Sequence, residues 1–517
     1  MKVVVRWRRV RIVVRWRPAR RDSSRPLGLK ERTIRGGSAR MLAQAGNFLL
    51  RIGSMMVLSR LLNPRDFGLV NMVTAFTGVL TLFRDFGLSA ASVQKATITE
   101  EQTSTLFWIN VATGALLTVV AMASAPLVGR FYHEPRLVWV TSVVAVAFLV
   151  NGFGVQHSAM LQRQMRFSRL ASIDISALVI GTVIAIGLAK LGLGYWALVA
   201  MTVSGPFITT VAVWMATGWY PGPPERGIGL RSLMRFGGTM TLNGLVLYVA
   251  YNFVNVLLGR FWGAEAIGIY SRAYQLIRIP TDNLNSSVGE VAFAALSRVQ
   301  DEPERLKRYF LKGYSLVLAL TLPMTIACAL FADDVIAVLL GPKWKAAGVI
   351  FRLLAPTILV FAIANPLGWL LSALGLVGRG LKIALAFAPF MIIGTLVGLP
   401  YGPKGVATTY SVVMTVWLIP TIIWAVHGTV ISVWDIVKAP IRPMISSLVA
   451  AGIAFGARYF YGPMLSPLPR LVVEGIVLVT AYLAMLLFVT GKRSFYLDLL
   501  RGSKGPTPAE ENSLASA

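Results

Sequence analysis

Long apolar runs separated by short polar segments recur along the whole chain of 517 residues. Each run is close to the roughly 20 residues that an α-helix needs to cross a bilayer. The pattern predicts an all-α polytopic membrane protein with about 14 transmembrane helices. The predicted spans lie at roughly 41–62, 67–90, 104–128, 136–156, 170–190, 193–217, 237–259, 266–296, 313–332, 346–374, 380–399, 404–427, 440–461 and 468–490.

The second six spans repeat the first six at an offset of 200 residues. The matched positions flank apolar runs of span length in both copies, which indicates an internal duplication. Six is an even number, so both copies insert the same way up. We therefore expect two six-helix bundles related by a pseudo-twofold axis along the membrane normal. The matched residues are Arg35, Gly37, Arg60 and Gly68, and then Arg235, Gly237, Arg260 and Gly268.

The repeat divides the chain into six parts. We expect a basic, disordered cytoplasmic segment at 1–36, bundles at 37–217 and 237–427, a cytoplasmic connector at 218–236, two additional helices at 428–490 and a disordered cytoplasmic tail at 491–517. For residues 1–25, a disordered extension competes with a polybasic arm that binds anionic lipid headgroups. No loop exceeds about 20 residues, which is too short for a folded domain.

Composition and charge agree with a membrane protein. The chain is 56% hydrophobic and 14% charged, whereas soluble proteins carry about 25% charged residues. The net charge is +28, of which the first 40 residues contribute +12. Other Lys and Arg residues gather in alternate loops such as 156–170 and 297–312. The positive-inside rule then places both termini in the cytoplasm, and the basic balance calls for no nucleic-acid partner.

The sequence gives no reason to expect a metal or another cofactor. Cys328 is the single cysteine and lies inside an apolar run. The three histidines are His133, His157 and His427, and they share no ligand spacing.

Polar side chains form stripes on three predicted spans. Residues three and four positions apart share one face of a helix, so each stripe faces one way. Because a charge at mid-bilayer costs at least about 2.5–3.5 kcal/mol, we interpret the stripes as the lining of a water-filled cavity. For the scattered polar groups Arg84, Asp85, Asp174, Glu290 and Glu474 we favour structural roles. The stripes are Gln44, Asn47, Arg51 and Ser54; Tyr248, Asn252 and Asn255; and Ser271, Tyr274, Gln275, Arg278, Asp282 and Asn285, interrupted by Pro280.

Several blocks of sequence resemble a known family. They include LLNPRDFGLV (61–70), FRDFGLSAASVQK (83–95), QRQMRFSRLA (162–171), GRFWGAEAIGIYSRAYQL (259–276) and GPKW (341–344). From about Leu27 to Gly491 the chain is similar to the polysaccharide-exporting flippases of the multidrug/oligosaccharidyl-lipid/polysaccharide exporter superfamily. The resemblance implies two six-helix bundles around a central cavity. It also implies transfer of undecaprenyl-diphosphate-linked oligosaccharide to the periplasmic leaflet. Relatives often carry an acid before the asparagine of the seventh helix, where this chain has Val254 before Asn255, so the resemblance does not extend to ion coupling through that position.

Arginines are the candidates for binding a diphosphate. The guanidinium group makes paired, charge-assisted hydrogen bonds to phosphate and stays charged. We expect Arg51 and Arg278, one from each half, to bind the diphosphate, with Arg272 and Arg352 guiding it nearer the outer face. The alternative is that each arginine pairs with an acid such as Asp85 or Asp282. Candidate contacts to sugar are Gln44, Asn47, Tyr248, Asn252, Asn255, Tyr274 and Gln275.

The favoured function is a flippase for lipid-linked oligosaccharide that works by alternating access in the cytoplasmic membrane and serves surface polysaccharide, capsule or O-antigen synthesis. The expected partners are a polyprenyl-diphosphate-linked oligosaccharide, membrane lipids and a polysaccharide polymerase or export machinery. One alternative is a multidrug antiporter, which needs an acidic cavity for cationic drugs. Another is a membrane polysaccharide polymerase or ligase, which needs larger outer loops. The last is a purely structural membrane protein.

Overall fold

The structure is a computed structural model that describes residues 5–7, 10–12, 46–84, 99–224, 230–461 and 464–489. It has two compact units, residues 1–47 and 48–517. In the first unit, strands β1 (Val5–Trp7) and β2 (Val10–Ile12) pair as an antiparallel hairpin. Valine and isoleucine alternate with arginine there, and a period of two favours strands. The predicted disordered segment 1–36 stays a prediction, and the predicted tail at 491–517 lies outside the described residues.

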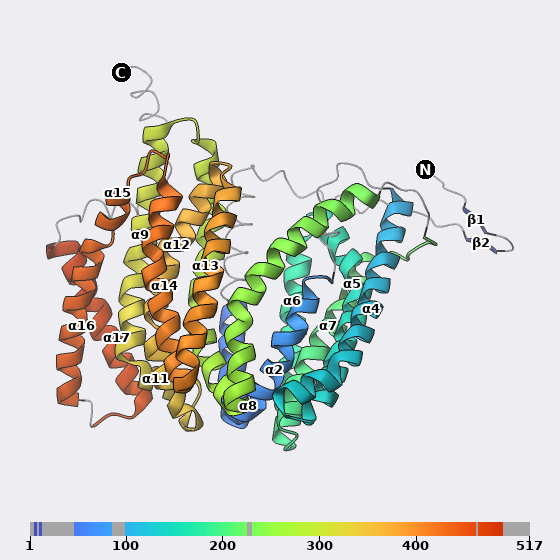
Figure 1. The fold of residues 1–517 in the computed structure, drawn as a ribbon, viewed down its shortest axis with the longest axis horizontal. Helices are drawn as coiled ribbons and strands as arrows, with labels where there is room; N and C mark the ends of the chain where they lie inside the picture. The colour runs from blue at the N-terminus through green and yellow to red at the C-terminus, as the bar shows by residue number, and fades with distance from the viewer. Residues whose placement is uncertain are drawn as a thin grey trace, which may run out of the picture. The chain divides into compact units, whose positions relative to one another are not determined.

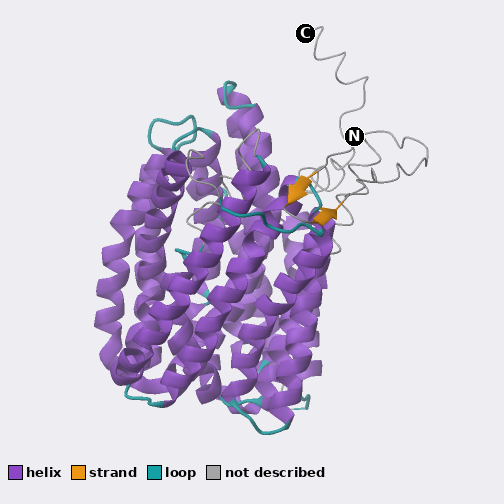
Figure 2. Ribbon diagram, turned by 90° about the vertical axis from the view of Figure 1, so that its right-hand side faces the viewer, coloured by secondary structure: helices purple, strands orange, loops and turns teal. Residues whose placement is uncertain are grey.

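Long helices make up the second unit and run side by side, with loops at both ends (Figures 1 and 2). A helix over residues 46–61 is followed by α2 (Pro64–Thr81), α4 (Glu100–Tyr132), α5 (Arg136–Arg163), α6 (Phe167–Lys190) and α7 (Tyr195–Thr217). Then come α8 (Leu230–Arg298), α9 (Pro303–Leu330), α10 (Ala332–Leu339), α11 (Lys345–Leu354), α12 (Pro356–Ala373), α13 (Val377–Gly398) and α14 (Gly402–Val426). The chain continues with α15 (Val433–Lys438), α16 (Ile441–Tyr461) and α17 (Pro467–Ala484).

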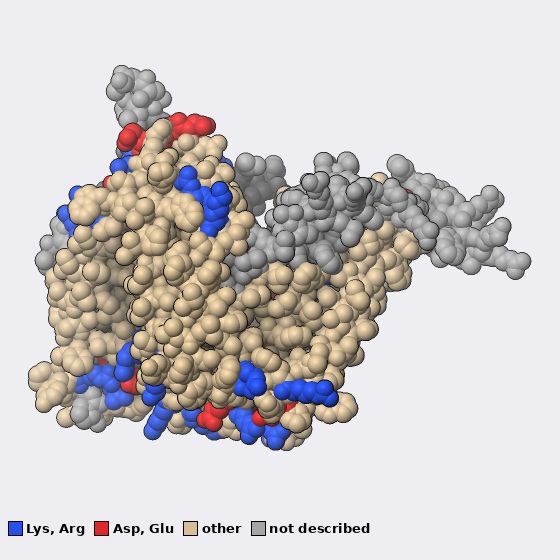
Figure 3. Space-filling view, in the orientation of Figure 1, with Lys and Arg blue, Asp and Glu red and all other residues tan. Residues whose placement is uncertain are grey.

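The helices have the length and composition of membrane spans. Within the described residues, 9 helical segments are long and apolar enough to cross a bilayer. One of them, Val377–Val426, contains both α13 and α14, so the expected number of about 14 is not confirmed. Charged side chains gather toward the two ends of the helices on the face in Figure 3 and leave an uncharged band between them. The predicted class, an all-α polytopic membrane protein, is confirmed.

The turn predicted between spans 237–259 and 266–296 is present, because α8 consists of two helical limbs that meet at a kink at Gly263. This residue has φ 79°, a conformation that glycine adopts without steric cost. Because α8 begins at Leu230, the end of the expected connector is helical. The expected span 346–374 is two helices, α11 and α12, and Pro356 at the start of α12 lacks the N–H that a continuous helix requires.

The two copies of the repeat meet where α2 crosses the second limb of α8. A Cβ atom added to Gly68 would lie 1.6 Å from the backbone oxygen of Ala264. One added to Gly268 would lie 1.9 Å from the backbone oxygen of Pro64. Positions 64 and 68 correspond to 264 and 268 in the repeat. The rotation that superposes one copy on the other therefore converts each of these two contacts into the other. Reciprocal contacts of this kind are the signature of a twofold interface and support the duplication.

The largest hydrophobic core surrounds this crossing and contains side chains from both copies. Phe67 on α2 packs edge-on against Trp344, with ring centroids 5.3 Å apart. The Nε1 atom of Trp344 is buried and donates to the backbone oxygen of Ser59 over 2.8 Å. A helix of the first copy is therefore fixed to the segment before α11 both by apolar packing and by a satisfied buried donor.

Candidate functional site

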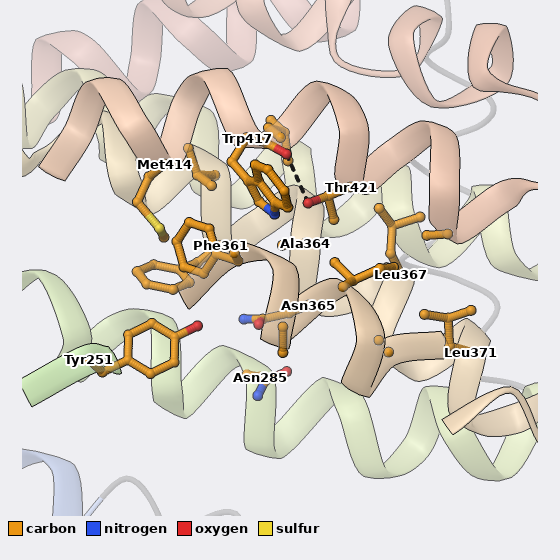
Figure 4. Close-up of a pocket in the computed structure, with 18 of the residues that line it drawn as sticks. Tyr251, Asn285, Phe361, Ala364, Asn365, Leu367, Leu371, Met414, Trp417 and Thr421 are labelled. Atoms are coloured by element: carbon orange, nitrogen blue, oxygen red, sulfur yellow. Dashed lines mark hydrogen bonds between the residues drawn. The ribbon is translucent and has the colours of Figure 1, made fainter. Parts of the chain in front are cut away.

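A cavity of about 860 Å³ lies among α8, α12, α13 and α14 (Figure 4). Its volume is toward the upper end of the roughly 300–1,000 Å³ that is usual for small-molecule sites. The polar and aromatic residues of its wall are Tyr248, Tyr251, Asn252, Asn255, Tyr274, Arg278, Asn285, Phe361, Asn365, Trp369, Ser372, Phe387, Trp417 and Thr421. The wall thus combines aromatic surface with carboxamide and hydroxyl groups.

The first limb of α8 supplies a ladder of tyrosine and asparagine. Tyr248 donates through its hydroxyl to the backbone oxygens of Thr74 and Ala75 on α2, each over 3.2 Å. The Nδ2 atom of Asn252 donates to the backbone oxygen of Tyr248 over 3.0 Å, and Asn255 donates to Asn252 over 3.4 Å. A carboxamide offers two donors and two acceptors in all, so this ladder retains hydrogen-bonding capacity toward the cavity.

Arg278, on the second limb of α8, gives the cavity its charge. It is the one ionised side chain among the described residues of the wall. Its guanidinium pairs with Asp282 over 3.0 Å and lies 5.0 Å from the ring centroid of Phe361. Both members of the pair are solvent-accessible, with 36% of the Arg278 side chain exposed. The guanidinium has five donors in a planar fork, so contact with one carboxylate leaves it able to bind an anion.

Tyr274 and Trp369, two aromatic residues of the wall, are held in place by hydrogen-bond partners. The hydroxyl of Tyr274 lies 3.0 Å from that of Tyr410 on α14. The Nε1 atom of Trp369 on α12 donates to the side-chain oxygen of Asn285 on α8 over 2.9 Å. Such bonds fix ring orientation and keep the buried polar atoms satisfied.

Six of the residues that the sequence predicts as cavity lining do line the cavity, namely Tyr248, Asn252, Asn255, Tyr274, Arg278 and Asn285. All six lie on α8, where polar side chains interrupt two apolar runs. Their proposed contacts with sugar and diphosphate stay predictions.

The other predicted residues lie elsewhere. Arg272 places its guanidinium 4.1 Å from the ring centroid of Phe67 and donates to Gln275. Arg352 pairs with Asp333 over 2.6 Å. Arg51 is exposed and interacts electrostatically with Asp174. Asn47 does not line the cavity, and Gln44 lies outside the described residues. The expectation that the twofold brings Arg51 and Arg278 into one cavity stays a prediction.

Sequence reasoning missed the wall that α12, α13 and α14 provide. Asn365 was the available signal, because it is an amide in the middle of an apolar run. Trp369, Phe387 and Trp417 carried no such signal, because aromatic residues in an apolar helix look alike whether they face a cavity or a packed core.

The fold and the cavity define a class: helical polytopic membrane proteins with a polar-lined cavity enclosed by their membrane-spanning helices. The particular family follows from sequence. The profile described as "Polysaccharide biosynthesis protein" matches residues 57–348, and the chain belongs to this family.

Curated relatives cover much of the chain. Lipopolysaccharide biosynthesis protein WzxC of Escherichia coli is 26% identical over 378 residues, which is 71% of this chain and 76% of the relative. Teichuronic acid biosynthesis protein TuaB of Bacillus subtilis is 33% identical over 294 residues, which is 56% of this chain and 61% of the relative.

Solved structures show the same fold at low sequence identity. Lipid II flippase MurJ in an inward closed conformation superposes with a TM-score of 0.71 at 13% identity, covering 89% of this chain and 100% of that structure. A multidrug resistance MATE family transporter in its inward-facing conformation gives a TM-score of 0.59 at 16% identity, covering 75% and 95%.

Proposed function

We propose that this protein is a flippase that moves a polyprenyl-diphosphate-linked oligosaccharide across the cytoplasmic membrane for cell-surface polysaccharide synthesis. The observation that carries the proposal is Arg278, a cation that lines a large polar and aromatic cavity among membrane-spanning helices. Relatives named for lipopolysaccharide and teichuronic acid biosynthesis, and a fold shared with a lipid II flippase, support the same substrate class.

The chemistry of the cavity suits such a substrate. Diphosphate and sugar groups cannot enter hydrocarbon without losing their hydration. Arg278 offers charge-assisted donors to the diphosphate, and Asn252 and Asn255 offer donors and acceptors to hydroxyl groups. The described wall contains no carboxylate, the group that a transporter of cationic drugs needs as a counter-ion. The cavity therefore favours an anionic, sugar-bearing headgroup.

The proposed transport cycle is alternating access. The two halves rock about the connector between α7 and α8 and open the cavity to one side of the membrane at a time. The placement of Lys and Arg in alternate loops supports cytoplasmic termini. The polyprenyl chain stays in lipid while the headgroup crosses through the cavity, and a polysaccharide polymerase or export machinery takes up the product.

Replacement of Arg278 tests the proposal. We expect Arg278→Gln to lose most export and Arg278→Lys to retain part of it, because lysine keeps the charge but not the planar fork. The measurement is surface polysaccharide, together with accumulated lipid-linked intermediates, in a deletion strain that expresses each variant.

The matched control is Arg305→Gln, which removes an exposed ion pair with Glu302 at the start of α9 and should leave export unchanged. Protein abundance in the membrane is measured alongside. Normal export by Arg278→Gln, or equal loss of abundance in the glutamine and lysine variants, contradicts a binding role for Arg278.

A further inference from the structure

The wall that α12 and α14 contribute to the cavity contains a hydrogen-bond donor without a partner. The Nε1 atom of Trp417 is buried, and no acceptor lies within hydrogen-bond distance in the described part of the protein. Buried donors nearly always have partners, so a donor without one in the wall of a cavity calls for an acceptor from a ligand. The ring itself is held against Phe390 and Phe387, with centroid distances of 4.6 and 5.9 Å.

A second polar group of this wall also has no hydrogen-bond partner. Asn365 lies on α12 and faces the cavity with Asn285 on the facing helix α8 (Figure 4). Asn285 already accepts a hydrogen bond from Trp369, whereas the carboxamide of Asn365 has no hydrogen-bonding side-chain or backbone partner among the residues described. The wall thus offers an indole N–H, a free carboxamide and aromatic surface within one cavity.

The charge of the cavity narrows the class of ligand. Arg278 and its partner Asp282 belong to α8, and the described residues that α12, α13 and α14 contribute are all uncharged. A hydrocarbon chain cannot form hydrogen bonds with an indole N–H or a carboxamide. A charged sugar would have no counter-ion on α12, α13 or α14. A neutral pyranose fits, because it has apolar C–H faces for an aromatic ring and oxygen atoms along its edge for donors.

We propose that Trp417 and Asn365 form a saccharide subsite for a neutral sugar residue of the transported lipid. Trp417 donates from Nε1 to a sugar oxygen and packs its ring on the sugar, and Asn365 hydrogen-bonds a neighbouring hydroxyl or acetamido group. This subsite deepens the proposed flippase function and rests on it: Arg278 holds the diphosphate, and α12 and α14 select the adjoining sugar. Selection then depends on the shape of a neutral sugar rather than on the net charge of the glycan.

Two lipid probes that differ only in the sugar test the subsite. Farnesyl diphosphate and farnesyl-diphosphate-linked N-acetylglucosamine are titrated against the purified full-length protein in nanodiscs. We expect Trp417→Phe to weaken binding of the sugar-bearing probe by about five- to tenfold, which is the loss of one neutral hydrogen bond. Binding of farnesyl diphosphate should not change.

The matched control is Trp424→Phe, on an exposed face of the same helix and outside the cavity, which should leave both affinities unchanged. Asn365→Ala is the second variant and should weaken the sugar-bearing probe alone. Unfolding temperatures establish that each variant is folded.

The outcomes separate the two proposals. Failure of the wild-type protein to bind either probe contradicts the proposed function. Wild-type binding of both probes with no effect of Trp417→Phe or Asn365→Ala overturns the saccharide subsite and leaves the diphosphate site standing. Equal weakening of both probes by Trp417→Phe also overturns the subsite, because it indicates a general change of the cavity.

Discussion

Two adjacent aspartates at the start of α10 show how burial determines the contribution of an ion pair to stability. Asp333 is 59% exposed and pairs with Arg352 over 2.6 Å. Asp334 is 1% exposed and contacts Arg458 on α16, over 3.0 Å, and Arg470 on α17. The exposed pair is screened by water, whereas the buried carboxylate compensates two arginines and connects the additional helices to the rest of the bundle.

We therefore expect Asp334→Ala to lower the free energy of unfolding by about 3–5 kcal/mol, because it leaves Arg458 and Arg470 without the buried carboxylate that compensates their charge. Asp333→Ala is the matched control and should cost less than about 1 kcal/mol. The measurement is thermal unfolding of the purified full-length protein in detergent. Protease sensitivity of α16 and α17 should rise in the Asp334 variant alone. Equal shifts in the two variants would show that the buried network does not stabilise the attachment.

At the scale of elements, helices were predictable wherever an apolar run ended in polar residues. The boundaries of α6 and α7 fall close to the predicted 170–190 and 193–217. The kink at Gly263 inside α8 was predictable as well, because Gly263 and Glu265 interrupt the apolar run there. The break before α12 was not predictable, since an isolated proline in an apolar run either kinks a helix or starts a new one.

The same contrast holds for the candidate site. Its α8 wall was predictable because Asn252, Asn255 and Arg278 are expensive to bury and so indicate a cavity. Its other wall was not, because Trp417 and Phe387 satisfy the rules for a packed core equally well. Which aromatic side chains face the cavity depends on contacts between helices far apart in sequence, and one chain gives no local signal for those contacts.

The close crossing of α2 and α8 yields a second stability prediction. Gly268→Ala places a methyl group 1.9 Å from the backbone oxygen of Pro64, so the helices must separate. We expect a loss of at least about 1–3 kcal/mol, the usual cost of overpacking. Gly205→Ala, in α7, meets no atom within 4 Å and should be neutral or slightly stabilising.

Thermal unfolding of the two glycine variants in detergent provides the measurement. The reciprocal contact predicts the same result for Gly68→Ala as for Gly268→Ala, because each glycine faces the repeat equivalent of the other's partner. A tolerated alanine at either position would show that the backbones do not approach so closely.

For the whole molecule, we propose that the crossing of α2 and α8 is the place where the two halves separate during transport. Asn71 on α2 donates a hydrogen bond to Ser271 on α8, and these positions are equivalents in the repeat. A residue that meets its own equivalent lies on the twofold axis, where rocking of the halves separates or joins them. If alternating access operates, this contact exists in one state and breaks in the other.

A crosslink between Asn71→Cys and Ser271→Cys, in a chain whose single Cys328 is replaced by alanine, should therefore stop transport. Oxidation should abolish transfer of a lipid-linked oligosaccharide in proteoliposomes, and a reductant should restore it. Thr118→Cys with Ala145→Cys is the matched control, because it joins α4 to α5 within one half, where Thr118 donates to the Ala145 backbone oxygen over 3.0 Å. Movement inside a bundle is not required, so the control crosslink should leave transport unchanged. Full activity with the α2–α8 crosslink complete would show that the halves do not separate at this crossing.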